Sequence, residues 1–418
     1  MNTAGNLAQF NTLMERCRAS AFYRDRLPAG SLTSFAEFKS LPFTTKDQLR
    51  EASPDGLLCV PKFEMLQYHE SFGTTGRPVS VWLTAEDLAH NARALADWGG
   101  GFRPDDVVMV RFPYALSGVA HMVQAAAQLE GACVIPMDAR TPVSPFPRVV
   151  ELLRKLNVTV LCCLPVQAVL IAETAELLGL RPREDFPVLR AIRTAGEPLP
   201  RGRLELIQEI WGLPVHDHYG LTEIGPAALA CEHGQLHPLL EDFIFEVLSE
   251  ETMQDVRAGE VGLLVATTLK RRGTPLLRYI TGDLVRFSAS KCPCGKHVMM
   301  ESHGRCESVM QINGRRLDLC DLDRIIAGLP CRRYWAAGPG AGGLHIVAEE
   351  EKGATEVPAE LVRDLEAELR LPVRVEILPR GALYDRNMLL AVAEVGKPRY
   401  LYSAREMKEG VFLRSKLL

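Results

Sequence analysis

A loop near the N-terminus combines glycine with hydroxyl side chains. It reads Ser71-Phe72-Gly73-Thr74-Thr75-Gly76 and is followed by Arg77. The backbone N–H groups of such a loop can wrap an oxyanion, the hydroxyls can donate further hydrogen bonds, and Arg77 adds positive charge. It is not a Walker loop, because the Gly-Lys-Ser/Thr ending is absent. We interpret it as a phosphate-binding loop, and the alternative is a flexible surface hairpin.

Further segments place polar side chains directly after predicted strands. Gly196-Glu197-Pro198 lies between a strand and a helix, where open α/β sheets bind ligands. The segment Tyr219-Gly220-Leu221-Thr222-Glu223 offers an aromatic face, a hydroxyl and a carboxylate suited to Mg²⁺. Asp283 follows another strand and suits a ribose diol, and Gly304-Arg305 comes after it. Each segment alone is consistent with an ordinary turn, but all five in this order favour a nucleotide site.

Strands that alternate with helices must position these segments. Apolar runs predict strands over residues 106–112, 132–136, 158–164 and 189–194, and helical patterns predict helices over 121–129, 147–156 and 201–211. This alternation is typical of a parallel sheet built from right-handed crossovers. From Phe243 the strands are closely spaced, which favours antiparallel sheet or a small barrel. After about residue 305, a hairpin at Asn313-Gly314 opens a compact α+β unit.

The fold expected from this pattern is α/β with two domains. Residues 1–305 form a large N-terminal domain of mixed sheets and helices with a small β-barrel-like part, and residues 306–418 form a small α+β domain. The composition is that of a soluble globular protein, with 47% apolar and 24% charged residues among 418. A net charge of −4 gives no reason to expect a nucleic-acid or membrane partner.

Targeting signals are not visible in the sequence. No run of 18 apolar residues predicts a membrane span, and the first twenty residues lack a basic region followed by an apolar one. We therefore expect a cytoplasmic protein. Its eleven cysteines are interpreted as reduced thiols and metal ligands rather than disulfides.

In order and spacing, the five segments resemble the adenylate-forming superfamily of acyl-CoA synthetases, adenylation domains and luciferases. The resemblance covers nearly the whole chain. The short length, the Gly196–Leu199 segment and the paired Cys292 and Cys294 resemble the phenylacetate–CoA ligase family most closely. Such enzymes use ATP to convert a carboxylate to an acyl adenylate, and a second nucleophile then displaces AMP.

The resemblance implies a role for each polar segment. Ser71–Gly76 would hold the β- and γ-phosphates, Thr222 would contact the α-phosphate, and Glu223 would bind Mg²⁺. The adenine and ribose would be held by Gly196, Glu197, Pro198, Tyr219, Gly220, Asp283 and Arg305. Glu307 would be the hinge of the mobile C-terminal domain, although relatives usually carry Asp there.

The C-terminus departs from the pattern of the family. Relatives carry a lysine that supports adenylation, and Lys397 is the best match, with Lys408 and Lys416 as alternatives. An insert, GALYDRNMLLAVAEV, precedes it where relatives have a shorter approach. Lys397 is therefore expected to act in adenylation, and the alternative is a solvated surface lysine.

The acid and its acceptor are less constrained. Phe112, Tyr114 and His121 lie where relatives build the acid pocket and would suit an aryl or arylacetic acid, although Phe112 and Tyr114 also fit as core residues. CoA is the expected acceptor by resemblance. An amine, an amino acid or a carrier protein is the alternative acceptor, and a non-catalytic nucleotide-binding homologue is the third hypothesis. The resemblance leaves a homodimer open.

Four side chains predict a structural zinc site. Cys292 and Cys294 place two thiolates one residue apart, and Cys231 and His237 lie on an earlier loop. Three sulfurs and one nitrogen form a closed tetrahedral set with no position for catalysis. Relatives in the phenylacetate–CoA ligase branch carry a similar arrangement. His233, His297 and Cys306 remain alternative ligands.

Overall fold

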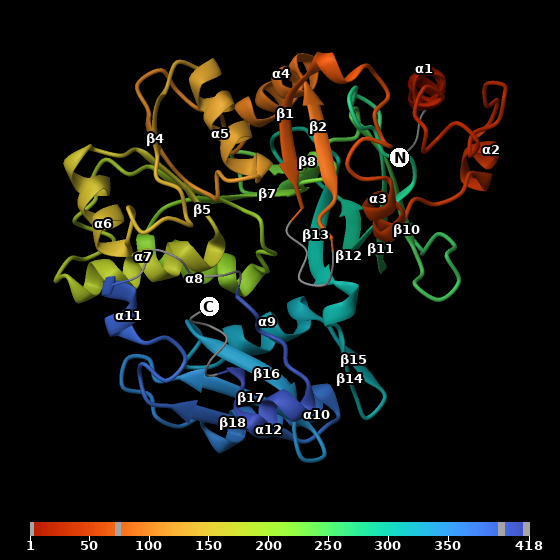
Figure 1. Ribbon diagram of the computed structural model, residues 1–418. Coiled ribbons are helices and arrows are strands. Elements are labelled where there is room, and N and C mark those ends of the chain that lie inside the picture. Colours follow the sequence, from red (N-terminus) through yellow and green to blue (C-terminus); the bar gives the residue numbers. More distant parts are fainter. Residues whose placement is uncertain (1–3, 72–76, 392–397, 413–418) are drawn as a thin grey trace. The chain divides into compact units, whose positions relative to one another are not determined.

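The computed structural model describes residues 4–71, 77–391 and 398–412 (Figure 1). The chain divides into two compact units, each assembled from separated stretches of sequence. The first unit contains residues 1–106, 113–134 and 216–301, and the second contains residues 107–112, 135–215 and 302–418. The change of unit between Glu301 and Ser302 lies near the domain boundary expected at residue 305, and that boundary stays a prediction.

The first unit carries five helices within its described residues and most of the antiparallel strands. Its helices are α1 (Ala4–Cys17), α2 (Phe35–Ser40), α3 (Lys46–Ala52), α4 (Ala85–Ala96) and α5 (Gly118–Leu129), with a 3₁₀ turn at Lys62–Glu64. Its strands are β1 (Met65–Glu70), β2 (Ser80–Thr84), β7 (Val215–Leu221), β8 (Gly225–Ala230), β9 (Leu236–Pro238), β10 (Phe243–Leu248), β11 (Val261–Thr268), β12 (Tyr279–Ala289) and β13 (Val298–Arg305).

Antiparallel pairing dominates this unit. β1 pairs with β2, β7 pairs with β8 and β8 with β9, and β10, β11 and β12 form consecutive pairs. The antiparallel sheet expected from the closely spaced strands after Phe243 is therefore confirmed. The core combines side chains of α1 and α2, such as Phe10 and Phe38, with side chains of β10 to β12, such as Ile244 and Val285.

The second unit contains the parallel strands. β3 (Val107–Arg111) pairs with β5 (Val160–Cys163), and β5 pairs with β6 (Ala191–Ala195). All three strands are largely buried, as expected when helices cover both faces. β5 is entirely apolar, β3 ends in Arg111, and β6 carries the buried Arg193 and Thr194. The neighbouring elements in sequence are β4 (Cys133–Pro136), α6 (Phe146–Lys155), α7 (Pro165–Leu177) and α8 (Arg201–Trp211). This confirms the predicted alternation of strand and helix.

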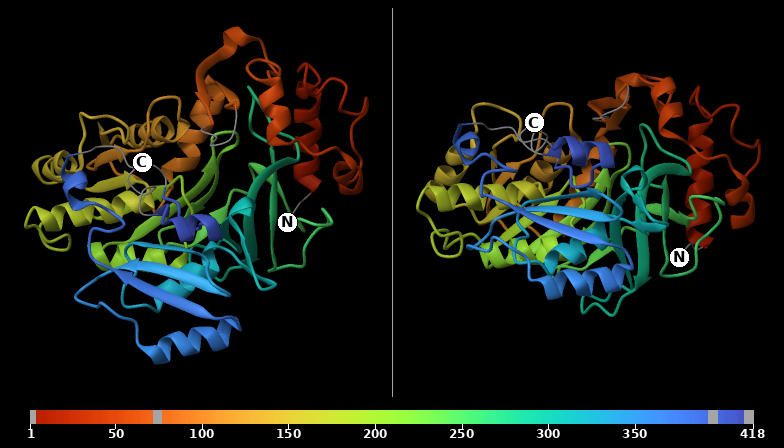
Figure 2. Two further views of the ribbon diagram at one scale, coloured as in Figure 1. Left: turned by 60° about the horizontal axis from the view of Figure 1, so that its bottom comes forward. Right: turned by 90° about the horizontal axis from the view of Figure 1, so that it is seen from below.

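The last part of the chain adds a small α+β arrangement to this unit. It contains a 3₁₀ turn (Cys306–Ser308), β14 (Met310–Ile312), β15 (Arg315–Leu317), α9 (Leu319–Ala327), β16 (Trp335–Pro339), β17 (Leu344–Glu349), α10 (Ala359–Leu369), β18 (Val373–Leu378), α11 (Arg386–Ala391) and α12 (Ala404–Glu409). The hairpin at Asn313-Gly314 is confirmed, and both residues have the positive φ that a two-residue turn requires. Figure 2 shows α10 running along the sheet of β16, β17 and β18.

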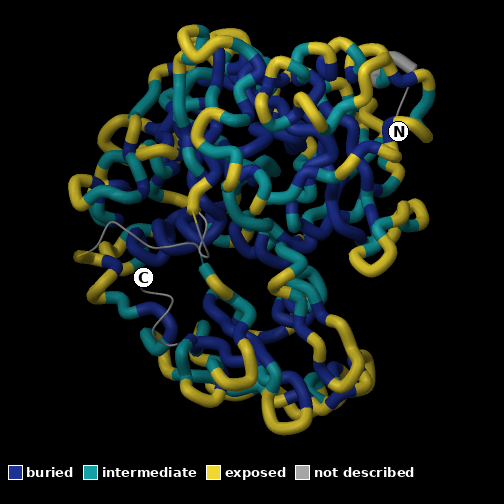
Figure 3. Tube along the Cα trace, turned by 45° about the vertical axis from the view of Figure 1, so that its right-hand side comes forward, coloured by how far each residue is buried: buried dark blue, intermediate teal, exposed yellow. Residues whose placement is uncertain are grey.

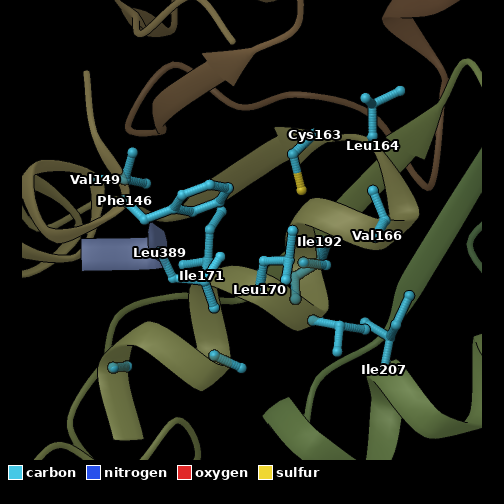
Figure 4. Close-up of a cluster of buried hydrophobic side chains, with 14 of the residues drawn as sticks. Phe146, Val149, Cys163, Leu164, Val166, Leu170, Ile171, Ile192, Ile207 and Leu389 are labelled. Carbon is cyan, nitrogen blue, oxygen red and sulfur yellow. The ribbon is translucent and has the colours of Figure 1, made fainter. Parts of the chain in front are cut away.

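Burial follows the strands and the inner faces of the helices, while loop ends are exposed (Figure 3). α7 is buried nearly all round, and its side chains pack with those of α6 and β5 around Phe146, Ile171 and Cys163 (Figure 4). Among the described residues, no helix has the length and apolarity needed to cross a membrane.

Candidate functional site

The ends of the predicted phosphate loop are tied together. The backbone N–H of Ser71 donates to the carbonyl of Val79 at 3.0 Å, and the N–H of Val79 donates back to the Ser71 hydroxyl at 3.1 Å. This pair of bonds closes the base of the loop between β1 and β2. Gly73, Thr74, Thr75 and Gly76 lie outside the described residues, so their predicted phosphate contacts stay a prediction.

Glu223 is a buried carboxylate that faces a lysine. It follows the end of β7, and its side chain is 4% exposed. The Lys46 ammonium lies 3.1 Å from its Oε1, yet among the described residues this oxygen accepts no hydrogen bond. The oxygen therefore keeps lone pairs that a divalent cation could use, and oxygen ligands are those that Mg²⁺ takes in proteins. Thr222, which precedes it, is half-buried on the same turn.

Asp283 and Tyr219 are joined directly. The Tyr219 hydroxyl donates to Asp283 Oδ2 at 2.7 Å, and the backbone N–H of Asp283 donates to the Thr281 hydroxyl at 3.1 Å. An aromatic ring and a carboxylate, predicted from separate segments to hold adenine and ribose, thus lie together. Gly220 follows Tyr219, and a Cβ there would lie 2.5 Å from the carbonyl oxygen of Gly225, which explains why no side chain is present.

The short helix α3 contacts all three of these segments. Thr44, just before it, exchanges backbone hydrogen bonds with Arg278 and Ile280 on the approach to Asp283. Lys46 faces Glu223, and Arg50 donates to the carbonyl of Arg77 at 3.0 Å, at the end of the phosphate loop. α3 therefore brings the loop, the buried carboxylate and the ribose-type aspartate to one place in the first unit.

Lys46 is a site residue that the sequence analysis missed. It occupies the first position of α3, directly after the N-cap Thr45, which forms a capping box with Gln48. A positive charge is unfavourable at the N-terminal end of a helix dipole, where acidic residues are preferred. A lysine at that position is therefore a signal for a partner elsewhere, and here the partner is Glu223.

The remaining nucleotide residues belong to the second unit. Gly196 follows β6 with φ +86°, and a Cβ there would lie 2.9 Å from the Leu164 side chain. Glu197 Oε1 accepts a hydrogen bond of 2.5 Å from the backbone N–H of Val166, in the first turn of α7, and Pro198 follows it. Arg305 is 36% exposed and lies 3.8 Å from Glu307. The joining of these residues with Tyr219 and Asp283 in one site stays a prediction.

The predicted acid-pocket residues fall on either side of the change of unit between Phe112 and Pro113. Phe112 is fully buried in the second unit, which fits the alternative that it is a core residue. Tyr114 and His121 lie together in the first unit, where the His121 ring nitrogen Nε2 is 3.0 Å from the Tyr114 carbonyl. His69, next to the phosphate loop, joins them with its ring centre 5.5 Å from that of His121. Burial and, to a smaller extent, electrostatic repulsion from the neighbouring His121 lower the pKa of His69 to about 4, so its ring is neutral near pH 7.

The four predicted zinc ligands meet in the first unit. Cys231, His237, Cys292 and Cys294 each offer a ligand atom, and these atoms all lie within 4.8 Å of one another. The sulfurs of Cys231 and Cys292 are 3.5 Å apart, and Cys294 Sγ is 3.4 Å from His237 Nε2. A tetrahedral zinc with bonds of about 2.0–2.3 Å requires ligand separations of roughly 3.5 Å. The separations of the four ligand atoms are therefore compatible with a bound zinc ion.

The imidazole of His237 is oriented for this role. Its Nδ1 lies 2.6 Å from the carbonyl of Val298, so Nδ1 carries the proton and Nε2 presents its lone pair to the sulfurs. The alternative ligand His233 is 43% exposed and lies beside Glu232 instead. Burial raises the pKa of Cys231 to about 11, so a metal would have to displace its proton.

Of the three candidate C-terminal lysines, the described residues include Lys408. Lys397 and Lys416 lie outside the described residues, so their roles stay predictions. Lys408 lies in the last turn of α12, a surface helix.

Comparisons with known proteins identify a family and related enzymes. The profile of the family described as "AMP-binding enzyme" matches residues 71–268. A phenylacetate-coenzyme A ligase of Thermus thermophilus is 32% identical over 301 residues, covering 69% of this chain and 66% of that protein. One from Aromatoleum evansii is 27% identical over 305 residues, covering 72% and 68%. The match thus spans about two thirds of the length of these curated relatives.

A solved structure extends the similarity to nearly the whole fold. The structure of 2-hydroxyisobutyryl-CoA ligase in the postadenylation state, in complex with 2-HIB-AMP, gives a TM-score of 0.84 at 22% identity. The alignment covers 98% of this chain and 91% of that one. The expected fold class and family resemblance are confirmed: the chain belongs to the adenylate-forming superfamily of AMP-binding enzymes and is similar to its phenylacetate–CoA ligases.

Proposed function

We propose that the protein uses ATP to convert a carboxylic acid to an acyl adenylate, and then transfers the acyl group to CoA with release of AMP. The observation that carries the proposal is the meeting of three segments at α3. Lys46 of that helix faces Glu223, Arg50 holds the end of the phosphate loop, and Thr44 pairs with the strand that leads to Asp283. Together, a cation, a buried carboxylate and a ribose-type aspartate are suited to binding a nucleoside triphosphate.

The chemistry requires two anions to meet. A carboxylate must attack the α-phosphorus of ATP, so the charges of both partners must be screened. The chain supplies the Lys46 ammonium and the N–H groups of the Ser71 loop for the phosphates, and Glu223 would hold Mg²⁺, which stabilises phosphate charge when bound. Tyr219 and Asp283 would orient the adenosine so that positioning contributes to the rate.

The acid is proposed to be aryl or arylacetic. The relatives named phenylacetate-coenzyme A ligase support this class. The rings of Tyr114 and His121 lie in contact and would line the acid pocket, and His69, which contacts His121, is an addition to the predicted set. The acceptor is proposed to be CoA, and an amine or carrier protein remains the alternative that a product assay separates.

Residues 306–418 are proposed to change position between the adenylation and thioester-forming half-reactions. Lys397 would support adenylation, and Glu307 would be the hinge about which residues 306–418 rotate between the two half-reactions. Such conformational steps commonly separate half-reactions and often limit turnover.

A structural zinc ion is proposed for Cys231, His237, Cys292 and Cys294. The separations of the ligand atoms and the orientation of His237 support it. All four positions of a tetrahedral zinc would be filled by protein, so this ion would stabilise the fold and take no part in the reaction.

A pyrophosphate-release screen tests the proposed function. Aryl, arylacetic and alkyl acids are supplied with ATP and Mg²⁺, with and without CoA. The proposal predicts pyrophosphate release that depends on the acid, and turnover that rises when CoA is added. Release that rises with an amine but not with CoA would support the amide-forming alternative, and no release with any acid would contradict the proposal.

A further inference from the structure

A buried glutamate on α7 holds three arginines from the end of the chain. The Glu173 side chain is 2% exposed, and its carboxylate lies 2.8 Å from Arg333, 2.6 Å from Arg380 and 3.0 Å from Arg386. Burial works to raise the pKa of Glu173, but the hydrogen bond from Arg380 and the charges of Arg386 and Arg333 lower it overall. Glu173 is therefore ionised, and its partners all lie after residue 330, with Arg380 and Arg386 close together in sequence.

Arg386 links this glutamate to a second buried carboxylate. Its Nη1 lies 2.6 Å from Glu349, at the end of β17. Glu349 also accepts hydrogen bonds of 2.5 and 3.0 Å from the backbone N–H groups of Leu383 and Tyr384. The guanidinium of Arg386 lies over the ring of Tyr334, at 4.8 Å from its centre. Two carboxylates and a ring thus hold Arg386 at the first position of α11.

Apolar contacts hold the same stretch. Leu383 is fully buried, and Tyr384 and Leu389 are each 1% exposed. Leu389, from α11, lies among side chains of α6 and α7, including Phe146 and Ile171 (Figure 4). Residues 379–391, which we call the docked segment, include most of the insert that distinguishes this chain from its relatives.

We propose that Glu173 is a positioning residue for the adenylation half-reaction, which it serves by holding the docked segment on α7. The inference rests on the proposed function. The docked segment ends at Ala391 and leads into the stretch that contains Lys397, eleven positions after Arg386. Fixing Arg386 and Leu389 restricts where the chain that follows can reach.

Ion pairs suit an attachment that must also release. A buried ion pair contributes little net stability, because the loss of hydration offsets most of the attraction. Removing one partner, however, leaves the other charges buried and unpaired. Glu173 therefore specifies where the docked segment lies without binding it irreversibly, since the arginines regain water when the segment leaves.

The test compares Glu173→Gln with Glu176→Gln. Glu176 lies one turn further along α7 and pairs with Arg333, but the structure gives it no contact with Arg380 or Arg386. Adenylation is measured with ATP and acid, and thioester formation is measured with synthetic acyl adenylate and CoA. Backbone hydrogen exchange of α11 is measured in the full chain, because it reports docking without any reaction.

The expected result separates the two half-reactions. Glu173→Gln should slow adenylation by roughly tenfold to a hundredfold, the scale for lost positioning remote from the reacting atoms. It should leave the rate of thioester formation within about twofold of the wild-type rate and speed hydrogen exchange in α11. Glu176→Gln should leave the adenylation rate, the thioester-formation rate and the exchange rate within about twofold of wild type. If Glu173→Gln does not fold, Arg380→Gln is used instead, because that side chain is 54% exposed.

Two results would overturn the inference. One is an equal fall of both half-reactions, which would give Glu173 a purely structural role, and the other is unchanged exchange in α11. If the wild-type chain adenylates no acid, the proposed function fails instead, and the exchange measurement still decides whether Glu173 holds the docked segment.

Discussion

At the scale of single residues, Lys46 and Glu223 form the centre of the account. In the absence of a metal ion, the ammonium neutralises a carboxylate that is 4% exposed. An unpaired charge at such burial would be costly. Under the proposed function, Glu223 would hold Mg²⁺ and Lys46 would face phosphate charge instead. The pair would then keep the site electrically balanced with and without substrate.

Lys46→Met should slow adenylation by about two orders of magnitude, the scale for loss of one electrostatic stabiliser. The apolar chain of methionine keeps the packing but supplies no charge to the phosphates. Lys39→Met is the matched control, because Lys39 pairs with Asp255 at the surface of the same unit. Steady-state pyrophosphate release measures both variants, and equal rates would remove Lys46 from the site.

His218 predicts how stability depends on pH. Burial lowers its pKa from an ordinary 6.5 to about 4, and neither ring nitrogen has a hydrogen-bond partner among the described residues. Because the folded state disfavours the protonated ring, the stability is fully present above pH 6.5 and falls as the pH drops toward 4. His218→Phe, which keeps an aromatic contact with Trp98, should remove the contribution of His218 and leave that of His69, whose pKa is also lowered to about 4.

The size of the effect is on the order of 2 kcal/mol between pH 6.5 and 4.5 for one such histidine. Denaturant unfolding of the wild type and of His218→Phe at both pH values measures it. Parallel pH profiles for the two proteins would show that His218 does not titrate in this range, contrary to the prediction.

At the scale of elements, the zinc set joins two loops. Cys231 and His237 flank the turn between β8 and β9, and Cys292 and Cys294 lie between β12 and β13. These loops are about sixty residues apart in sequence, so a shared ion would restrict the unfolded chain and hold the strands in place. Without the ion, three thiols would lie close together at that point, with Cys292 and Cys294 partly exposed.

Removing the metal should therefore destabilise the protein more than it alters the chemistry. Protein purified without added metal should contain about one equivalent of zinc, and a strong chelator should lower the unfolding midpoint by at least several degrees. Cys292→Ser should do the same, whereas Cys133→Ser, at an exposed cysteine outside the set, should not. Less than about a tenth of an equivalent of zinc would refute the site.

Elements with a strong local signal were predictable from the sequence. β3 and β5 are short, mainly apolar runs between helical patterns, and the Asn313-Gly314 turn needs a positive φ at both positions. α5 begins at Gly118, three residues before the expected start. The sequence gives no signal for this start, because the first turn carries small residues and Ser117 makes no side-chain capping bond. Local patterns therefore predict the existence of an element more accurately than its first residue.

Long-range partners were not predictable. No motif marks Lys46, and its partner is 177 positions away, from residue 46 to residue 223. No motif marks Glu173 either, and its arginine partners lie at positions 333, 380 and 386. The four proposed zinc ligands could be grouped in advance because cysteine and histidine are informative residue types, while lysine and glutamate are common everywhere.

At the scale of the whole molecule, the chemistry is divided between separately assembled parts. The first unit contains α3, Glu223, Asp283 and the zinc set, and the second contains Glu197, Arg305 and the docked segment. An enzyme that performs two reactions at one site gains from having such parts, because one part can be rearranged while the other retains the intermediate. The proposed alternation concerns residues 306–418, which form only part of the second unit, so it stays a prediction.

The central claim is that ATP is cleaved between its α- and β-phosphates only when a carboxylic acid is present. The most direct measurement identifies the nucleotide product, by chromatography, after incubation with ATP, Mg²⁺, CoA and the best acid from the screen. Wild-type protein should form AMP, pyrophosphate and acyl-CoA in equal amounts, and Glu223→Ala should slow this by roughly two orders of magnitude or more. Formation of ADP and phosphate, or AMP formation that is independent of the acid, would contradict the account.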